Sequence, residues 1–106
     1  MGCMQSHAQS ETPLDRFVAS LANETPPIDL TGALLGVWWA LRGAWQNAHD
    51  AVQNHSPECS WVHAALHREE GDHSNADYWY RQAGRPVAQD DPRTEYLAIA
   101  SELLSL

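Results

Sequence analysis

Three histidines lie among acids and aromatic residues in the stretch WVHAALHREEGDHSNADYWY, residues 61–80. His63 and His67 are four residues apart, so on a helix they share one face, and Glu70 follows three residues later on the same side. Imidazole and carboxylate groups in this pattern suit two tasks. They either ligate a transition-metal ion or form a hydrogen-bonded network that joins neighbouring helices.

The network hypothesis places His63 and His67 between packed helices, chiefly to hold structure, because a buried unpaired polar group costs about 1–3 kcal/mol. Their candidate partners are Glu70, Asn75, Tyr78 or an indole N–H. The alternative is a metal site whose ligands are His49, His63, His67 and Glu70. The spacing is not that of the H-E-x-x-H motif, so we favour the network and expect no metal or other cofactor.

A third hypothesis is a pocket in which basic and aromatic side chains hold a carboxylate or phosphate. Its residues would be Arg68, Arg81 and Arg85 with Trp61, Tyr78 and Trp79. Alternatively, Arg68 pairs with Asp72 or Glu69 at the surface, which contributes little to stability. The candidate ligand-binding residues are therefore Trp61, His63, His67, Arg68, Glu70, Tyr78 and Trp79. No glycine-rich phosphate loop or G-x-S-x-G turn is present, so we expect no catalytic residues and no enzyme.

Helix-capping residues and glycines predict that helices position these side chains. Pro13 and Pro92 suit first helical positions, Ser60 or a neighbour begins the central helix, and Gly71 ends it before the N-cap Asp72. No stretch alternates with period two, so no sheet is expected. The sequence predicts a leader over 1–11, a single domain over 12–106, and helices over 13–23, 32–42, 44–53, 60–70, 73–83 and 92–105.

An internal repeat relates two of the predicted helical hairpins. A shift of 28 residues aligns Gly43 with Gly71, which suit tight turns between helices. It also aligns Leu35 with His63, Trp39 with His67, Ala48 with Ala76 and Val52 with Tyr80. These are inward positions of tetratricopeptide-like hairpins, so Tyr80 is expected in the core. The predicted fold is all-α: two stacked tetratricopeptide-like hairpins flanked by N- and C-terminal capping helices.

About half of the chain, residues 38–86, resembles a group of small, functionally uncharacterised bacterial proteins. The residues that carry the resemblance are Trp61-Val62-His63-Ala64, Leu66-His67-Arg68, Glu70-Gly71-Asp72, Asn75-Ala76, Tyr78-Trp79-Tyr80 and Ala83-Gly84-Arg85-Pro86, preceded by Trp39-Ala40-Leu41, Gly43, Trp45, Ala48-His49 and Gln53. The resemblance implies a compact helical protein and no particular activity.

Charge and cysteine content limit the partners and the compartment. Fourteen acids face six bases, all arginine, for a net charge of −8, which argues against nucleic acid as a partner. No apolar run approaches the roughly 20 residues of a membrane span. Cys3 and Cys59 have no disulfide or zinc spacing, and this predicts a reducing, cytoplasmic location. The start MGCMQS fits either a myristoylation site, with Cys3 for a second acyl chain, or a polar leader.

The sequence favours a non-enzymatic helical-repeat interaction module that binds a protein or peptide through a groove lined by Trp, Arg and His. The alternative is a metal-dependent or small-ligand-binding protein built on His63, His67 and Glu70. Contiguous exposed aromatic residues would favour the first function, and convergent polar groups would favour the second. The sequence does not decide between a monomer and a homo-oligomer.

Overall fold

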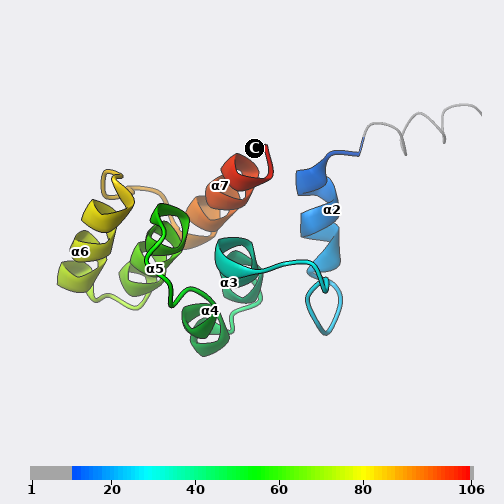
Figure 1. Cartoon of the computed structure of the whole chain (residues 1–106), viewed down its shortest axis with the longest axis horizontal. Coiled ribbons are helices and arrows are strands. Elements are labelled where there is room, and N and C mark those ends of the chain that lie inside the picture. Colours follow the sequence, from blue (N-terminus) through cyan, green and yellow to red (C-terminus); the bar gives the residue numbers. More distant parts are fainter. Residues whose placement is uncertain (1–10, 106) are drawn as a thin grey trace, which may run out of the picture.

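The computed structural model describes residues 11–105; the predicted leader, apart from Glu11, and its MGCMQS start lie outside this range. The fold prediction is confirmed, because all regular structure in the described residues is helical (Figure 1). The helices are α2 (Pro13–Ser20), α3 (Gly32–Leu41), α4 (Trp45–Ala51), α5 (Pro57–Glu69), α6 (His73–Ala83) and α7 (Pro92–Leu104).

Capping side chains explain where the helices begin. Thr12 and Asp15 form a reciprocal capping box at α2, and the Asp91 side chain accepts the Thr94 N–H at α7. The predicted start of the central helix near Ser60 is wrong. The Ser56 side chain accepts the Cys59 N–H and Pro57 occupies the first helical position, so α5 begins one turn earlier.

Two antiparallel helical hairpins, α3–α4 and α5–α6, stack on one another (Figure 1). Gly43 and Gly71 turn the chain between the helices of each pair with φ of 79° and 88°, a left-handed conformation that favours glycine. Gly36 allows α3 and α4 to approach closely, since a Cβ there would lie 2.5 Å from Cγ1 of Val52. In this stack α4 packs against α5, and this contact brings histidines from the two helices together.

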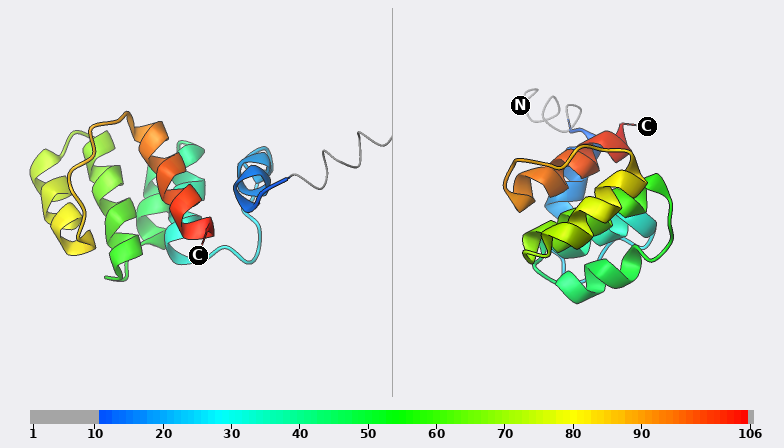
Figure 2. Two further views of the ribbon diagram at one scale, coloured as in Figure 1. Left: turned by 90° about the horizontal axis from the view of Figure 1, so that it is seen from above. Right: turned by 90° about the vertical axis from the view of Figure 1, so that its left-hand side faces the viewer.

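The flanking helices hold the stack from one side. Figure 2 shows α7 lying across the hairpins, and it packs against α3 and α5 rather than continuing the series beyond α6. Helix α2 packs against α7, and Ser20 at its end accepts a hydrogen bond from the Trp38 indole. Because α2 does not cover α3 in the manner of a preceding hairpin, Leu35 and Trp39 are only partly buried, unlike His63 and His67 at the equivalent positions.

A buried carboxylate joins α7 to the second hairpin. Glu95 is 3% exposed, and its Oε2 accepts hydrogen bonds from the Tyr80 hydroxyl at 2.6 Å and the Trp61 indole at 3.2 Å. Its Oε1 accepts from Nε and Nη2 of Arg68 at 3.2 and 2.9 Å. Burial alone would lower the pKa of Arg68, yet the contacts with Glu95 and Tyr80 raise it, so the guanidinium keeps its charge. Tyr80 is in the core, as predicted.

Among the described residues, no helix combines the length and apolar character needed to cross a membrane.

Candidate metal centre

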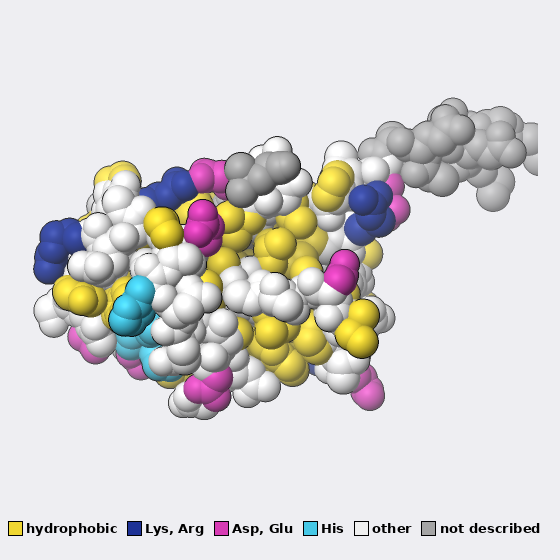
Figure 3. All heavy atoms as spheres, in the orientation of Figure 1, with side chains coloured by type: hydrophobic (Ala, Val, Ile, Leu, Met, Phe, Trp, Pro, Cys, Tyr) yellow, Lys and Arg dark blue, Asp and Glu magenta, His cyan; other side chains and the backbone are white. Residues whose placement is uncertain are grey.

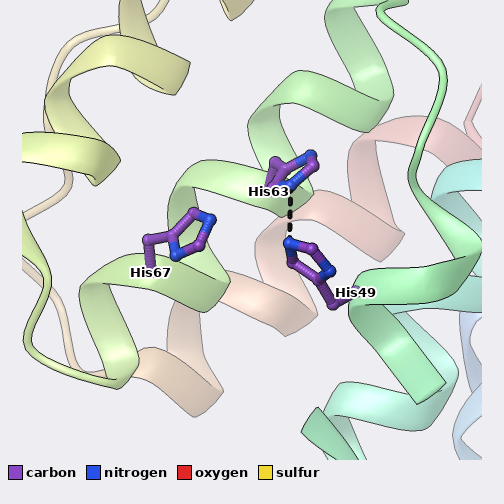
Figure 4. Close-up of side chains that lie close together, drawn as sticks. All are labelled: His49, His63 and His67. Atoms are coloured by element: carbon purple, nitrogen blue, oxygen red, sulfur yellow. Dashed lines mark hydrogen bonds between the residues drawn. The ribbon is translucent and has the colours of Figure 1, made fainter. Parts of the chain in front are cut away.

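Three histidines from two helices converge at the joint between the hairpins. His49 comes from α4, and His63 and His67 come from successive turns of α5 (Figure 4). One ring nitrogen of each lies within 4.8 Å of the other two, and Nε2 of His49 is 3.0 Å from Nε2 of His63. Figure 3 shows histidine side chains together at the surface between α4 and the near ends of α5 and α6.

The His49 ring is held by its own helix and the turn after it. Trp45, one turn earlier, stacks on it with ring centroids 4.8 Å apart and planes 12° from parallel. The Trp45 indole donates a hydrogen bond to the Leu66 carbonyl at 2.9 Å, which ties α4 to α5. At the edge of the ring, Nδ1 of His49 lies 3.2 Å from the Gln53 amide nitrogen. The second nitrogen, Nε2, is therefore directed at His63.

The His63 ring is buried between two helices. Trp79 of α6 covers one face, with centroids 4.1 Å apart and planes 1° from parallel. Nδ1 of His63 is buried without a hydrogen-bond partner, although the backbone of Val52 is near enough to favour a proton there. A proton on Nδ1 leaves the lone pair on Nε2, which faces His49.

The His67 ring is oriented by a carboxylate. Its Nδ1 hydrogen-bonds to Oε2 of Glu70 at 2.7 Å, and the Asn75 amide nitrogen lies 3.5 Å from its Nε2. A proton on Nδ1, donated to Glu70, again leaves a lone pair on Nε2. The prediction that His63 and His67 are buried and hydrogen-bonded is confirmed: they are 4% and 7% exposed, and they contact His49 and Glu70.

The cluster disfavours protonation. The pKa of His63 is lowered to about 4, first because burial opposes the charged ring and then because His49 and His67 would repel it. The pKa of His49 is also lowered, mainly by burial and then by His67, against the opposing effects of Asp50 and Glu70. At neutral pH these two rings are neutral, which is the state that ligates a metal ion.

The geometry is close to that of a ligand set. A tetrahedral zinc ion with Zn–N bonds of about 2.0–2.1 Å holds its nitrogen ligands about 3.3 Å apart. The 3.0 Å separation of the His49 and His63 nitrogens is near that value, and a nitrogen of His67 lies within 4.8 Å of both. Glu70 hydrogen-bonds to His67, as the network hypothesis predicts, and does not group with the three histidine nitrogens as the metal alternative expected. Carboxylates commonly orient metal-ligating histidines in this way.

The other predicted ligand-binding residues divide between separate clusters. Arg68 pairs with buried Glu95, not with Asp72 or Glu69 at the surface as in the alternative above. Trp61 is 8% exposed and lies under the Arg85 guanidinium, 3.6 Å from its ring centroid. Trp79 instead covers His63, and Tyr78 meets it edge-on with 46% exposure. The arginines and aromatic residues therefore do not form the single anion pocket that was hypothesised.

Sequence reasoning did not assign roles to Trp45, Gln53 and Glu95. Trp45 and Gln53 each stand four residues from His49, so helical spacing around His49 would have found them. Glu95 stands four residues before buried Ile99, and an isolated acid on an apolar helix face signals a buried partner. No family model, curated protein or solved structure matches the chain, so its function has to be inferred from this geometry.

Proposed function

We propose that the protein binds a divalent transition-metal ion, with Zn²⁺ the best match, through His49, His63 and His67. The observation that carries the proposal is the convergence of three ring nitrogens within 4.8 Å from two different helices. Neutral imidazole is a preferred ligand of zinc, copper and nickel and a poor one for magnesium and calcium.

The surroundings of the three rings support the proposal. Each ring is fixed by a different neighbour: Trp45 on His49, Trp79 on His63 and Glu70 on His67. Such partners reduce the side-chain entropy that metal binding would otherwise cost.

Isothermal titration calorimetry on EDTA-treated, dialysed protein tests the proposal. We expect saturable binding of one Zn²⁺, no binding of Mg²⁺, and a zinc-dependent rise in melting temperature. His49→Ala is the most informative variant, because His49 is less buried than the other two and its loss leaves α5 intact. It should weaken zinc binding at least tenfold, the loss typical of a ligand or its direct support.

His73→Ala is the matched control, because His73 is an exposed histidine at the start of α6 outside the cluster. It should bind zinc like the parent protein. If zinc leaves the melting temperature unchanged and His67→Ala destabilises the EDTA-treated protein by a few kcal/mol, the histidines form only a structural network.

A second candidate function is the helical-repeat interaction module that binds a protein or peptide. The partly buried Leu35 and Trp39 favour it, because the equivalent face of α5 is covered by another helix. Under this proposal a partner helix, or a second copy of the chain, covers that face of a tetratricopeptide-like cytoplasmic protein. Sedimentation velocity at increasing concentration tests self-association, which Leu35→Glu should abolish without changing the circular dichroism spectrum.

A further inference from the structure

We propose that the metal ion keeps one coordination position for an exogenous monoanion, hydroxide or a carboxylate group, held also by the Asn75 amide. The inference rests on the proposed function, since it needs a metal ion at His49, His63 and His67. It assigns the site to the open, reactive type rather than to the closed structural type.

The number of ligands is the first argument. Among residues 11–105, no fourth histidine, cysteine or carboxylate groups with all three converging rings, although Glu70 and Asp72 form a second group with His67 alone. Glu70 is bonded to Nδ1 of His67, and the two nitrogens of one imidazole point in diverging directions. Glu70 therefore supports the ring without reaching the ion. Zinc with three protein ligands takes a fourth ligand from solvent or substrate.

Charge is the second argument. Three neutral imidazoles leave the full double positive charge on the ion, unlike a site with carboxylate or thiolate ligands. The indoles of Trp45 and Trp79 cover the outer faces of His49 and His63, and removing water from these faces strengthens the attraction for an anion. The net charge of −8 acts against multiply charged ligands such as phosphate, so a small monoanion is favoured.

Asn75 is the third argument. Its amide nitrogen lies 3.5 Å from Nε2 of His67, the atom that would bind the ion. Once that lone pair is taken by metal, the amide N–H has lost its acceptor beside the ion. It then donates to whatever anion occupies the open position. The other contact of this amide, a hydrogen bond to Oδ2 of Asp72 at 3.3 Å, holds the side chain beside His67.

Cobalt(II) substitution tests the inference, because the visible absorption of cobalt reports its coordination. The probe is azide, titrated into the cobalt-loaded full chain. We expect a saturable change in the visible spectrum of the parent protein. Asn75→Ala should retain cobalt affinity and bind azide about tenfold more weakly, the equivalent of one hydrogen bond to a charged ligand. Asn47→Ala, an exposed amide on α4, should behave like the parent.

Two outcomes would overturn the inference. A cobalt spectrum that azide does not change would show a closed site, while metal binding, and with it the proposed function, would stand. Equal azide affinity in Asn75→Ala and the parent would remove Asn75 from the site. Absence of any cobalt spectrum would instead defeat the proposed function together with this inference.

Discussion

Replacement of Glu95 by glutamine tests the buried network that joins α7 to the second hairpin. The change keeps the side-chain volume, removes the charge and turns one acceptor oxygen into a donor amide. Arg68, with its side chain 14% exposed, then lacks a counter-charge. Breaking such a buried pair costs about 3–5 kcal/mol, and the low end applies where some solvent reaches the cation. The new amide NH₂ group also faces either Arg68 or the Tyr80 and Trp61 donors. Because it cannot accept a hydrogen bond, at least one of these donors loses its partner.

We therefore expect Glu95→Gln to lower the free energy of unfolding by about 3–5 kcal/mol, a large fraction of the stability of a domain of this size. The melting temperature should fall by about 12 °C or more. Urea unfolding followed by far-ultraviolet circular dichroism measures the change. Glu102→Gln is the control: Glu102 pairs with Arg85, both side chains are more than a third exposed, and its loss should cost less than about 1 kcal/mol.

A double-mutant cycle with Tyr80→Phe isolates the network. Tyr80→Phe alone removes one donor and should cost about 1–2 kcal/mol. In the Glu95→Gln background, Tyr80→Phe should cost clearly less, because the carboxylate that accepted the hydrogen bond from the Tyr80 hydroxyl is already gone. Additive effects, or a Glu95→Gln protein as stable as Glu102→Gln, would refute the assignment of Glu95 as the shared buried acceptor.

Three further predictions concern the hairpin packing, a turn and the pH dependence. Gly36→Ala should destabilise by about 1–2 kcal/mol in urea, since the Cβ contact with Val52 outweighs the gain in helix propensity; an equally stable variant would show that α3 and α4 are farther apart. Gly71→Val should lower the free energy of unfolding by about 2 kcal/mol. The whole cost comes from the left-handed φ of 88°, since an added Cβ would contact no other atom; unchanged thermal melting would contradict this turn. In EDTA, the folded pKa of His63 near 4 lies below the unfolded value of 6.5, so the unfolded chain binds more protons and stability should fall by up to about 3 kcal/mol as pH drops from 6.5 to 4. Melting curves across this pH range should show that stability depends less on pH in His63→Gln, and that it depends on pH in His73→Ala as it does in the parent protein.

The helices could be predicted from the sequence because their signals are local. Thr12, Asp72 and Asp91 cap the helices that follow them, and Gly71 turns the chain where it was expected. The start of α5 was misplaced by one turn, since Ser56 and Ser60 are both plausible caps by type. Only the hydrogen bond from the Cys59 N–H to Ser56 decides between them.

The sequence alone could name His49, His63 and His67 together as possible ligands, but it could predict their proximity only for the two on one helix. Spacing places His63 and His67 on one face of α5, but the approach of His49 depends on how α4 is seated against α5. That seating is set by long-range contacts such as the one between the Trp45 indole and the Leu66 carbonyl. The Glu95 network escaped prediction for the same reason, because α7 could have capped α6 instead of crossing α3 and α5.

The stacking of indoles on imidazoles has a spectroscopic consequence. Trp45 and Trp79 lie face to face with His49 and His63, so the excited states of these two indoles are in contact with the histidine cluster. A paramagnetic or charged group bound to those rings quenches the indole fluorescence. The remaining tryptophans, Trp38, Trp39 and Trp61, have other partners and supply an emission background against which this loss is read. We therefore expect a metal ion at the proposed site to change the emission of Trp45 and Trp79, so that intrinsic fluorescence can report metal binding without an added dye.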